Sequence, residues 1–294
     1  MIVCCGVAKR RSLLVFAGVI ALAAPLVWGF ALEPASLRNE DYELALPDWP
    51  PGCDGLRVAV LADLHVGSPF NGRAKLASVV ALTQRARPDL VLLAGDYVIH
   101  GIPGGHYTPP DEIAEELDRL SAPLGVFAVL GNHDHWLDAR LVRTALESHG
   151  IPVLEDSVIR LYSARCEFWL AGIGDYWTTA HDVTRTLAQV SDDAPVVAFT
   201  HNPDLFPDVP ARVSLTIAGH THGGQVFLPW LGRPVVPSRY GERYAIGHVV
   251  ESGRHLFVSP GLGTSIAPVR FRVPPEVSVL ILRAADATRA PAGA

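Results

Sequence analysis

Short, uninterrupted apolar runs alternate with amphipathic stretches along most of the chain. Val/Leu/Ile runs without internal polar residues are typical of strands covered on both faces of a sheet, and apolar residues every three or four positions are typical of helices. The alternation predicts an α/β protein with its helices outside the sheets. The expected strands are 56–62, 90–94, 126–130, 196–200 and 215–218, and the expected helices are 73–85, 111–120, 139–148 and 182–190.

The same pattern divides the chain into four parts. A basic flank, 1–12, precedes an uncharged and mostly apolar run, 13–30, and one globular domain is expected over 45–283. The tail 284–294 has the composition of a disordered segment. The 294 residues, 49% of them hydrophobic, are enough for one large domain or two modest ones with a core.

The apolar run near the N-terminus has two interpretations. Its 18 residues (30 − 13 + 1) are close to the lower limit for a helix that spans about 30 Å of hydrocarbon. Trp28 and Phe30 resemble interfacial anchors of a transmembrane helix, whereas a cleaved signal peptide is the alternative. Lys9, Arg10 and Arg11 should stay in the cytoplasm in either case. Both interpretations therefore place the globular domain outside the cytoplasm.

Charge and cysteine content narrow the choice of partners. The formal net charge of −6 argues against a protein that tracks a nucleic-acid backbone, because such proteins usually carry a basic surface. Cys53 and Cys166 lie in the globular part and could form a disulfide if that part is exported. Unpaired buried thiols are an equal alternative, and the oligomeric state is left open.

Metal-binding residue types follow each of the five expected strands directly. Ligands of open α/β sheets bind beyond the carboxyl ends of the strands, so these groups should converge on one rim of the sheets. Glycines at three of the turns allow the backbone to bend sharply there. A lone Asp-x-His would be weak evidence, but five such groups, each at a strand end, are not expected by chance. The groups are Asp63-Leu64-His65, Gly95-Asp96, Gly131-Asn132-His133-Asp134, His201-Asn202 and Gly219-His220-Thr221-His222.

This ordered set resembles the calcineurin-like metallophosphoesterase superfamily, whose pattern is Asp-x-His, Gly-Asp, Gly-Asn-His-Asp/Glu, His and Gly-His-x-His. The stretches 201–206, 219–226, 259–263 and 274–276 also resemble the membrane-associated or exported bacterial phosphodiesterases of the YaeI/YkuE type. The resemblance implies a four-layer α/β/β/α sandwich with an N-terminal transmembrane or signal helix, and it makes 45–283 the catalytic domain. It also implies a bacterial inner-membrane protein whose catalytic domain faces the periplasm or exterior, or one exported after signal cleavage.

The resemblance assigns roles to nine residues. One metal ion would be held by Asp63, His65, Asp96 and His222, and a second by Asp96, Asn132, His201 and His220, with Asp96 bridging the pair. His133 would stabilise charge or protonate the leaving oxygen, and Asp134 would orient His133. Four imidazoles among the ligands favour Mn²⁺, Zn²⁺ or Fe over Mg²⁺ and Ca²⁺, which prefer oxygen ligands.

These assignments predict a metal-dependent phosphoric ester hydrolase. Two cations about 3.5–4 Å apart can neutralise a phosphate and present a metal-bound hydroxide for in-line attack. The expected substrate is a phosphodiester or pyrophosphate near the membrane, with lipid-linked and nucleotide-linked esters as the candidates. A nuclease of the same fold and a non-catalytic metal-binding scaffold at the membrane are the alternatives.

Residues outside the motifs receive simpler interpretations. Trp136 and Trp177 are expected to pack in the core or at its rim, although they could line a substrate groove. The segment 102–110 is expected to be a solvated connection. Five arginines are expected mostly on a solvated face, with contact to an anionic headgroup as the alternative; they are Arg233, Arg239, Arg243, Arg270 and Arg272.

Overall fold

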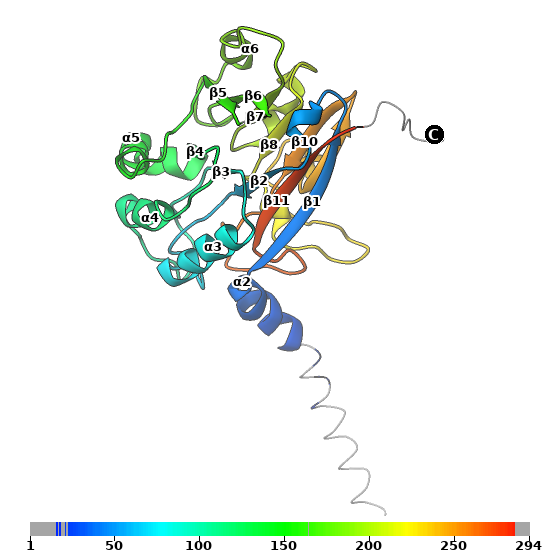
Figure 1. Cartoon of the computed structure of the whole chain (residues 1–294). Helices are drawn as coiled ribbons and strands as arrows, with labels where there is room; N and C mark the ends of the chain where they lie inside the picture. Colours follow the sequence, from blue (N-terminus) through cyan, green and yellow to red (C-terminus); the bar gives the residue numbers. More distant parts are fainter. Residues whose placement is uncertain (1–15, 17, 19–20, 22, 164, 286–294) are drawn as a thin grey trace, which may run out of the picture.

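Two β-sheets face each other in the computed structural model, which describes residues 16, 18, 21, 23–163 and 165–285 (Figure 1). The first sheet has the order β1 (Arg38–Leu46), β11 (Glu276–Ala284), β2 (Leu56–Leu61), β3 (Leu90–Ala94), β4 (Val126–Val129). The second has the order β5 (Ser157–Tyr162), β6 (Glu167–Gly172), β7 (Val196–Phe199), β8 (Leu215–Ala218), β10 (Arg254–Val258), β9 (Gly247–Glu251).

The strands that carry the motifs are parallel within each sheet. In the first sheet β2, β3 and β4 run parallel, and β11 is antiparallel to β2. In the second sheet β6, β7, β8 and β10 run parallel, with β5 and β9 antiparallel at the edges. Parallel strands present their carboxyl ends at one rim. The topology therefore places the five motif groups where the sequence expects them.

Helices cover the outer face of each sheet. The first sheet is covered by α3 (Arg73–Arg85), α4 (Pro110–Leu117) and α5 (Asn132–Ser148), whose apolar faces pack on β2, β3 and β4 (Figure 1). The second is covered by α6 (Val183–Leu187) and the 3-10 helix η3 (Pro203–Asp208). Side chains such as Val60, Phe199 and Ile217 fill the space between the sheets. The mixed α/β fold with two sheets is therefore confirmed.

The expected elements are found, but the hydrophobic pattern missed six strands. All five expected strands are present within one residue at each end, and α5 begins seven residues before the expected start. Among the missed strands, β1 and β9 carry exposed and half-buried polar side chains because they are edge strands. Their burial depends on neighbours distant in sequence, for example the pairing of Arg38 with Glu276.

The N-terminal segment joins the domain through a short helical stretch. Residues 23–27 continue into the π-helical turn η1 (Trp28–Leu32) and the α2 turn (Glu33–Ala35). The Gly29 carbonyl accepts a hydrogen bond from the Arg270 amide, and the buried Glu33 carboxylate accepts one from the Val273 amide. Within the described residues, none of the helices has both the length and the apolar character needed to cross a bilayer. Three of the expected parts lie wholly or partly outside the described residues: all of the flank 1–12, much of the segment 13–30, and residues 286–294 of the tail.

A disulfide joins the two halves of the sandwich. Cys53, in the 3-10 turn η2 (Pro51–Cys53) before β2, is bonded to Cys166, which precedes β6 of the second sheet. Both residues are buried, and they are 113 positions apart in sequence. The alternative of unpaired buried thiols is therefore wrong, because the fold brings the two Cα atoms to 4.5 Å.

Candidate metal and phosphoester site

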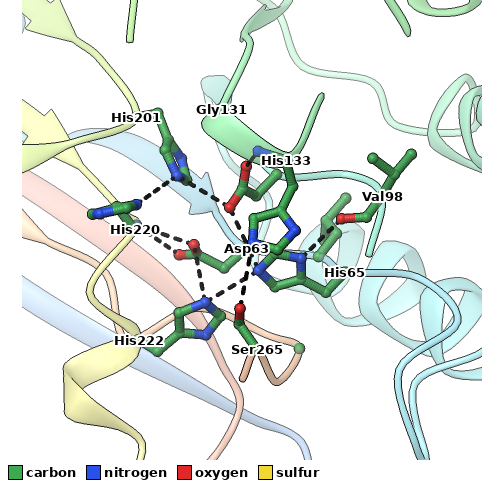
Figure 2. A network of polar contacts seen from close by, with 12 residues as sticks. Asp63, His65, Val98, Gly131, His133, His201, His220, His222 and Ser265 are labelled. Carbon is green, nitrogen blue, oxygen red and sulfur yellow. Dashed lines mark hydrogen bonds and ion pairs between the residues drawn. The ribbon is translucent and has the colours of Figure 1, made fainter. Parts of the chain in front are cut away.

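The five motif groups meet at the carboxyl ends of the central strands. Asp63 and His65 follow β2, Asp96 follows β3, and Asn132 and His133 open α5 directly after β4. His201 follows β7, while His220 and His222 follow β8. Figure 2 shows the labelled imidazoles turned toward one another around Asp63. All nine residues singled out in the sequence are buried at this one place; they are Asp63, His65, Asp96, Asn132, His133, Asp134, His201, His220 and His222.

The backbone at this rim adopts a conformation that L-residues seldom use. Five of the motif residues have a positive φ: Asp63 (52°), His65 (40°), Asp96 (59°), His220 (71°) and His222 (52°). Such conformations cost free energy and persist where the surrounding structure imposes them, often at functional sites. Here they occur directly after the ends of β2, β3 and β8, where the chain leaves the sheets.

Glycines leave room for the two carboxylates. A Cβ on Gly131 would lie 2.2 Å from Asp96 Oδ1, and a Cβ on Gly95 would lie 2.6 Å from the Gly131 nitrogen. Asp63 is enclosed in the same way, because a Cβ on Gly219 or Gly261 would lie 2.8 Å from Asp63 Oδ2. The glycines of the motifs therefore serve close packing around the carboxylates as well as the turns.

The first group of donors consists of Asp63, His65 and His222. His222 Nε2 lies 3.5 Å from Asp63 Oδ1 and 3.1 Å from His65 Nε2. His65 Nδ1 donates to the Val98 carbonyl at 2.9 Å, so the Nε2 lone pair is directed into the site. Hydrogen bonds of this kind orient the ring of a metal-ligating histidine.

The second group of donors consists of Asp96, His201 and His220. His201 Nε2 lies 3.2 Å from Asp96 Oδ2 and 3.1 Å from His220 Nδ1. His201 Nδ1 donates to the Ala94 carbonyl at 2.8 Å, which leaves Nε2 for the site. Asp96 also touches the first group, because its Oδ2 is 3.5 Å from His65 Nε2. Its position between the groups is the one that a bridging ligand needs.

The donor set fits divalent transition metals. The sets Asp63–His65–His222 and Asp96–His201–His220 each have donor atoms within 4.8 Å of one another. Asn132 Oδ1 is buried beside them and has no hydrogen-bond partner among the described residues. A buried oxygen without a partner costs free energy unless something binds it. Imidazole with carboxylate and amide oxygen suits Mn²⁺, Fe or Zn²⁺.

Burial dominates the protonation of this cluster. Burial lowers the pKa of His65 to about 3 and that of His222 well below its usual range, so both rings are neutral and keep a free lone pair. Burial raises the pKa of Asp63 to about 7, and the charge of Asp96 adds to the effect. For His201, burial is outweighed by Asp96, which raises its pKa to about 10. A bound cation would replace the His201 proton.

His133 lies beside the donor groups and faces a pocket. Its backbone amide donates to Asp96 Oδ1 at 2.8 Å, which fixes the start of α5 against the site. Its Nε2 lies 3.4 Å from Ser265 Oγ, and its Nδ1 lies 3.4 Å from His100 Nδ1. Burial lowers the pKa of the His133 ring.

Asp134 has a different set of partners from the one expected. The orienting contact to the His133 ring is not among the hydrogen bonds of the described residues. The Asp134 carboxylate instead accepts from the backbone amides of Gly131 and Asp96 at 2.8 Å and of Tyr97 at 2.9 Å. This difference arises because Asp134 points back across the first turn of α5 toward the loop after β3. Asp134 therefore holds two motif loops together.

A pocket of about 460 Å³ opens beside these groups. Motif residues at the carboxyl ends of the strands form one wall, among them Asp96, His133 and His222. Trp136 packs against the His133 ring with centroids 4.7 Å apart, and Trp177 packs edge-on against His220 at 4.3 Å. Both tryptophans line the pocket, which is the position that the groove alternative predicts for them. The remaining wall is mostly apolar and includes Val226, Val235, Ile266, Ala267 and Val269.

The sequence patterns did not reveal three residues near the site. His100 and Ser265 line the pocket, and Arg270 is buried. His100 lies four residues after Asp96, and Ser265 follows the glycines of the 259–263 stretch. Arg270 is fully buried and donates to the carbonyls of Gly263, Pro260 and Val273, so the expected solvated position is wrong for this arginine. Isolated polar residues in loops carry no periodic signal that would have revealed these contacts.

Comparison with known proteins agrees with the geometry. The model of the calcineurin-like phosphoesterase family matches residues 56–224. The chain is 29% identical to the uncharacterized metallophosphoesterase YkuE of Bacillus subtilis, over 90% of this chain and 93% of the relative. It is 29% identical to the phosphodiesterase YaeI of Escherichia coli, over 94% and 99%. It is 26% identical to the UDP-2,3-diacylglucosamine pyrophosphatase LpxG of Chlamydia trachomatis, over 88% and 94%.

Proposed function

The chain belongs to the calcineurin-like phosphoesterase family and is a metal-dependent hydrolase, and we propose that it cleaves phosphodiester or pyrophosphate bonds of a substrate at a membrane surface. The observation that carries this proposal is the position of Asp96 between two His/Asp groups, with His133 beside them at the pocket wall. The names of the Escherichia coli and Chlamydia relatives support a diester or pyrophosphate as the bond that is cleaved.

The proposed ligands fall into two sets that share one carboxylate. Asp63, His65, Asp96 and His222 would hold one ion, and Asp96, Asn132, His201 and His220 the other. When bound, two such ions neutralise phosphate charge and acidify a water molecule for in-line attack. The short distances between donors of different residues, 3.1–3.5 Å, support a compact pair of sites.

Other residues would bind and orient the substrate. His133 Nε2 faces the pocket beside Ser265, where it could donate a proton to the oxygen that leaves phosphorus. Asp134 would be a positioning residue, because its carboxylate fixes the loop that carries Asp96. Trp136 and Trp177 would exclude water from the two sides of the pocket and contact the organic part of the ester.

Two observations support a location at the outer face of a membrane. The uncharged run 13–30 after a basic flank has the composition of a membrane anchor or export signal. The Cys53–Cys166 disulfide is of a kind that persists in oxidising compartments such as the periplasm. We place the catalytic domain outside the cytoplasm of a bacterial cell on this basis.

The test is hydrolysis of bis-p-nitrophenyl phosphate and p-nitrophenyl phosphate by the full chain in detergent, stripped of metal and reloaded with Mn²⁺ or Zn²⁺. The expected result is metal-dependent hydrolysis. Asp96→Asn should lose bound metal together with activity, whereas His133→Ala should keep its metal and lose about 100-fold in kcat. His149→Ala, at an exposed ion pair with Asp111, is the matched control and should behave as wild type. Full activity of His133→Ala, or activity without metal, would contradict the proposed mechanism.

A further inference from the structure

Loop 226–236, between β8 and β9, exposes two large apolar side chains at its tip. Trp230 is fully exposed and Leu231 is 68% exposed. The tip is a tight turn, because the Gly232 amide donates to the Leu228 carbonyl at 2.9 Å. Trp230 has a φ of 66°, a conformation that favours glycine. The chain thus holds a tryptophan in a strained turn, and its full exposure means that burial among the described residues does not compensate for this strain.

The N-terminal helical stretch exposes a second apolar surface. Leu26, Val27, Trp28, Phe30 and Leu32 are each about half exposed or more. They lie at or just after the end of the uncharged run 13–30, so the chain enters the domain directly from this hydrophobic segment. Tryptophan and phenylalanine at the end of such a run are typical of the interface between bilayer and water.

One segment of the domain binds both surfaces. The Arg270 amide donates to the Gly29 carbonyl of the helical stretch at 2.9 Å. On the adjacent residue, the Phe271 carbonyl accepts from the Phe227 amide at 2.9 Å, and the Phe271 amide donates to the Gln225 carbonyl at 2.8 Å. The helical stretch and loop 226–236 are therefore attached to consecutive residues before β11; Figure 1 shows the helix (blue) and the loop (yellow) projecting from the body of the domain.

Basic residues accompany the two surfaces. Arg272 is exposed beside Phe271, and Arg233 lies at the base of the turn, where its guanidinium stacks over Phe227 at 5.0 Å. The nearby Glu242 carboxylate accepts a hydrogen bond from the Arg233 backbone amide at 2.9 Å and so faces the base of the turn. Apolar tips flanked by arginines match the apolar core and anionic headgroups of a lipid bilayer.

The wall of the catalytic pocket continues onto this face. Val269 lines the pocket and also lies next to the helical stretch, since a Cβ added to Gly29 would lie 3.5 Å from Val269 Cγ2. Val235 and Ile266 line the pocket as well, and both are exposed at its mouth. An apolar path therefore leads from His133 to the surface that carries the two exposed patches.

Resting on the proposed function, we propose that the Trp230–Leu231 turn and the exposed side of residues 26–32 form one membrane-contacting face. This face sets the mouth of the catalytic pocket at the bilayer surface. The ester it selects is amphiphilic: the phosphate reaches the rim at His133, while the acyl or prenyl chains stay along the apolar wall and in the bilayer. Loop 226–236 is thus a second membrane contact besides the N-terminal segment, and it determines the orientation of the domain.

The test compares a lipid ester with a water-soluble one. The full chain is reconstituted in phosphatidylcholine–phosphatidylglycerol vesicles that contain phosphatidyl-p-nitrophenol; water adds to phosphorus, p-nitrophenolate leaves and phosphatidic acid remains. Trp230→Ser combined with Leu231→Ser should lower hydrolysis of the vesicle ester about tenfold, because the turn loses its interfacial anchors. Hydrolysis of bis-p-nitrophenyl phosphate should stay unchanged, since neither side chain lines the pocket.

A matched control and a second measurement separate the possible outcomes. Tyr162→Ser, which removes a side chain that is 69% exposed on β5, should leave both activities unchanged. Brominated lipids should quench the wild-type tryptophan fluorescence more than that of Trp230→Phe. Equal hydrolysis of the vesicle ester by wild type and the double variant, or equal quenching, would overturn the membrane-contacting face. A changed oligomeric state of the double variant with unchanged vesicle hydrolysis would assign the turn to a second copy and also overturn it. If the metal-loaded wild type does not hydrolyse bis-p-nitrophenyl phosphate, this result would instead contradict the proposed function.

Discussion

Gly131 and Asp96 occupy adjoining space that admits no side chain between them: a Cβ on Gly131 would lie 2.2 Å from Asp96 Oδ1. The same carboxylate accepts the His133 amide at 2.8 Å, so the first turn of α5 and the shared carboxylate have a fixed relative position. Gly131 of the Gly-Asn-His-Asp motif is therefore needed for two reasons. It allows the turn after β4, and it leaves room for the Asp96 carboxylate at the end of β3.

We expect Gly131→Ala to displace Asp96 and to reduce both bound metal and kcat by about 100-fold or more, since small misplacements of catalytic groups have large effects. Metal content per protein and hydrolysis of bis-p-nitrophenyl phosphate measure the effect. Gly72→Ala is the control, because among the described residues no heavy atom outside its two chain neighbours lies within 4 Å of a Cβ at that position. Normal metal content and activity of Gly131→Ala would show that Asp96 tolerates the displacement.

Arg270→Met should destabilise the domain by about 3 kcal/mol, because the carbonyls of Gly263, Pro260 and Val273 lose their donor in a buried place. Urea unfolding followed by circular dichroism measures the change in the free energy of unfolding. Arg272→Met, at the exposed position two residues later, should change it by less than about 0.5 kcal/mol. Equal effects of the two substitutions would show that the buried hydrogen bonds contribute nothing specific.

Reduction of the Cys53–Cys166 disulfide should lower the free energy of unfolding by about 4 kcal/mol, because the bond closes a loop with a sequence separation of 113 residues in the unfolded chain. Urea midpoints with and without dithiothreitol measure the difference. The double variant Cys53→Ala and Cys166→Ala should be destabilised without reductant and should not respond to it. A wild-type midpoint that is insensitive to reductant would argue against a stabilising role of the bond.

The ion pair of His135 with Glu155 should make stability depend on pH. For His135, burial lowers the pKa of the ring, but the hydrogen bond that the ring donates to Glu155 outweighs it and raises that pKa. The stabilisation is therefore fully present below the unfolded pKa of about 6.5 and is lost as the pH rises through the raised folded value. His135→Asn should cost about 1 kcal/mol near pH 5.5 and almost nothing near pH 9.

Urea unfolding of wild type and variant at both pH values measures this difference. His149→Asn is the control, since its partner Asp111 is largely exposed. A cost of His135→Asn that is the same at both pH values would assign the effect to packing and not to the charge of the ring.

The sequence by itself determined five buried strands, the motif residues at their ends and hence the chemistry of the site. Uninterrupted apolar runs specify burial on both faces locally, and parallel strands bring their carboxyl ends together. For this reason Asp63, Asp96 and His220 could be placed at one rim from their positions after β2, β3 and β8 alone. The edge strands β1 and β9 escaped detection because their polar composition becomes strand only through pairing with β11 and β10.

Only the tertiary structure decided which partners the remaining residues have. Asp134 binds the amides of Asp96 and Tyr97 instead of the neighbouring imidazole, because the loop after β3 lies across the first turn of α5. Arg270 is buried because its donors meet three carbonyls of one irregular loop, and Cys53 is bonded to Cys166 because the sheets face each other there. These contacts join positions far apart in sequence through irregular backbone, and no local periodicity encodes such geometry.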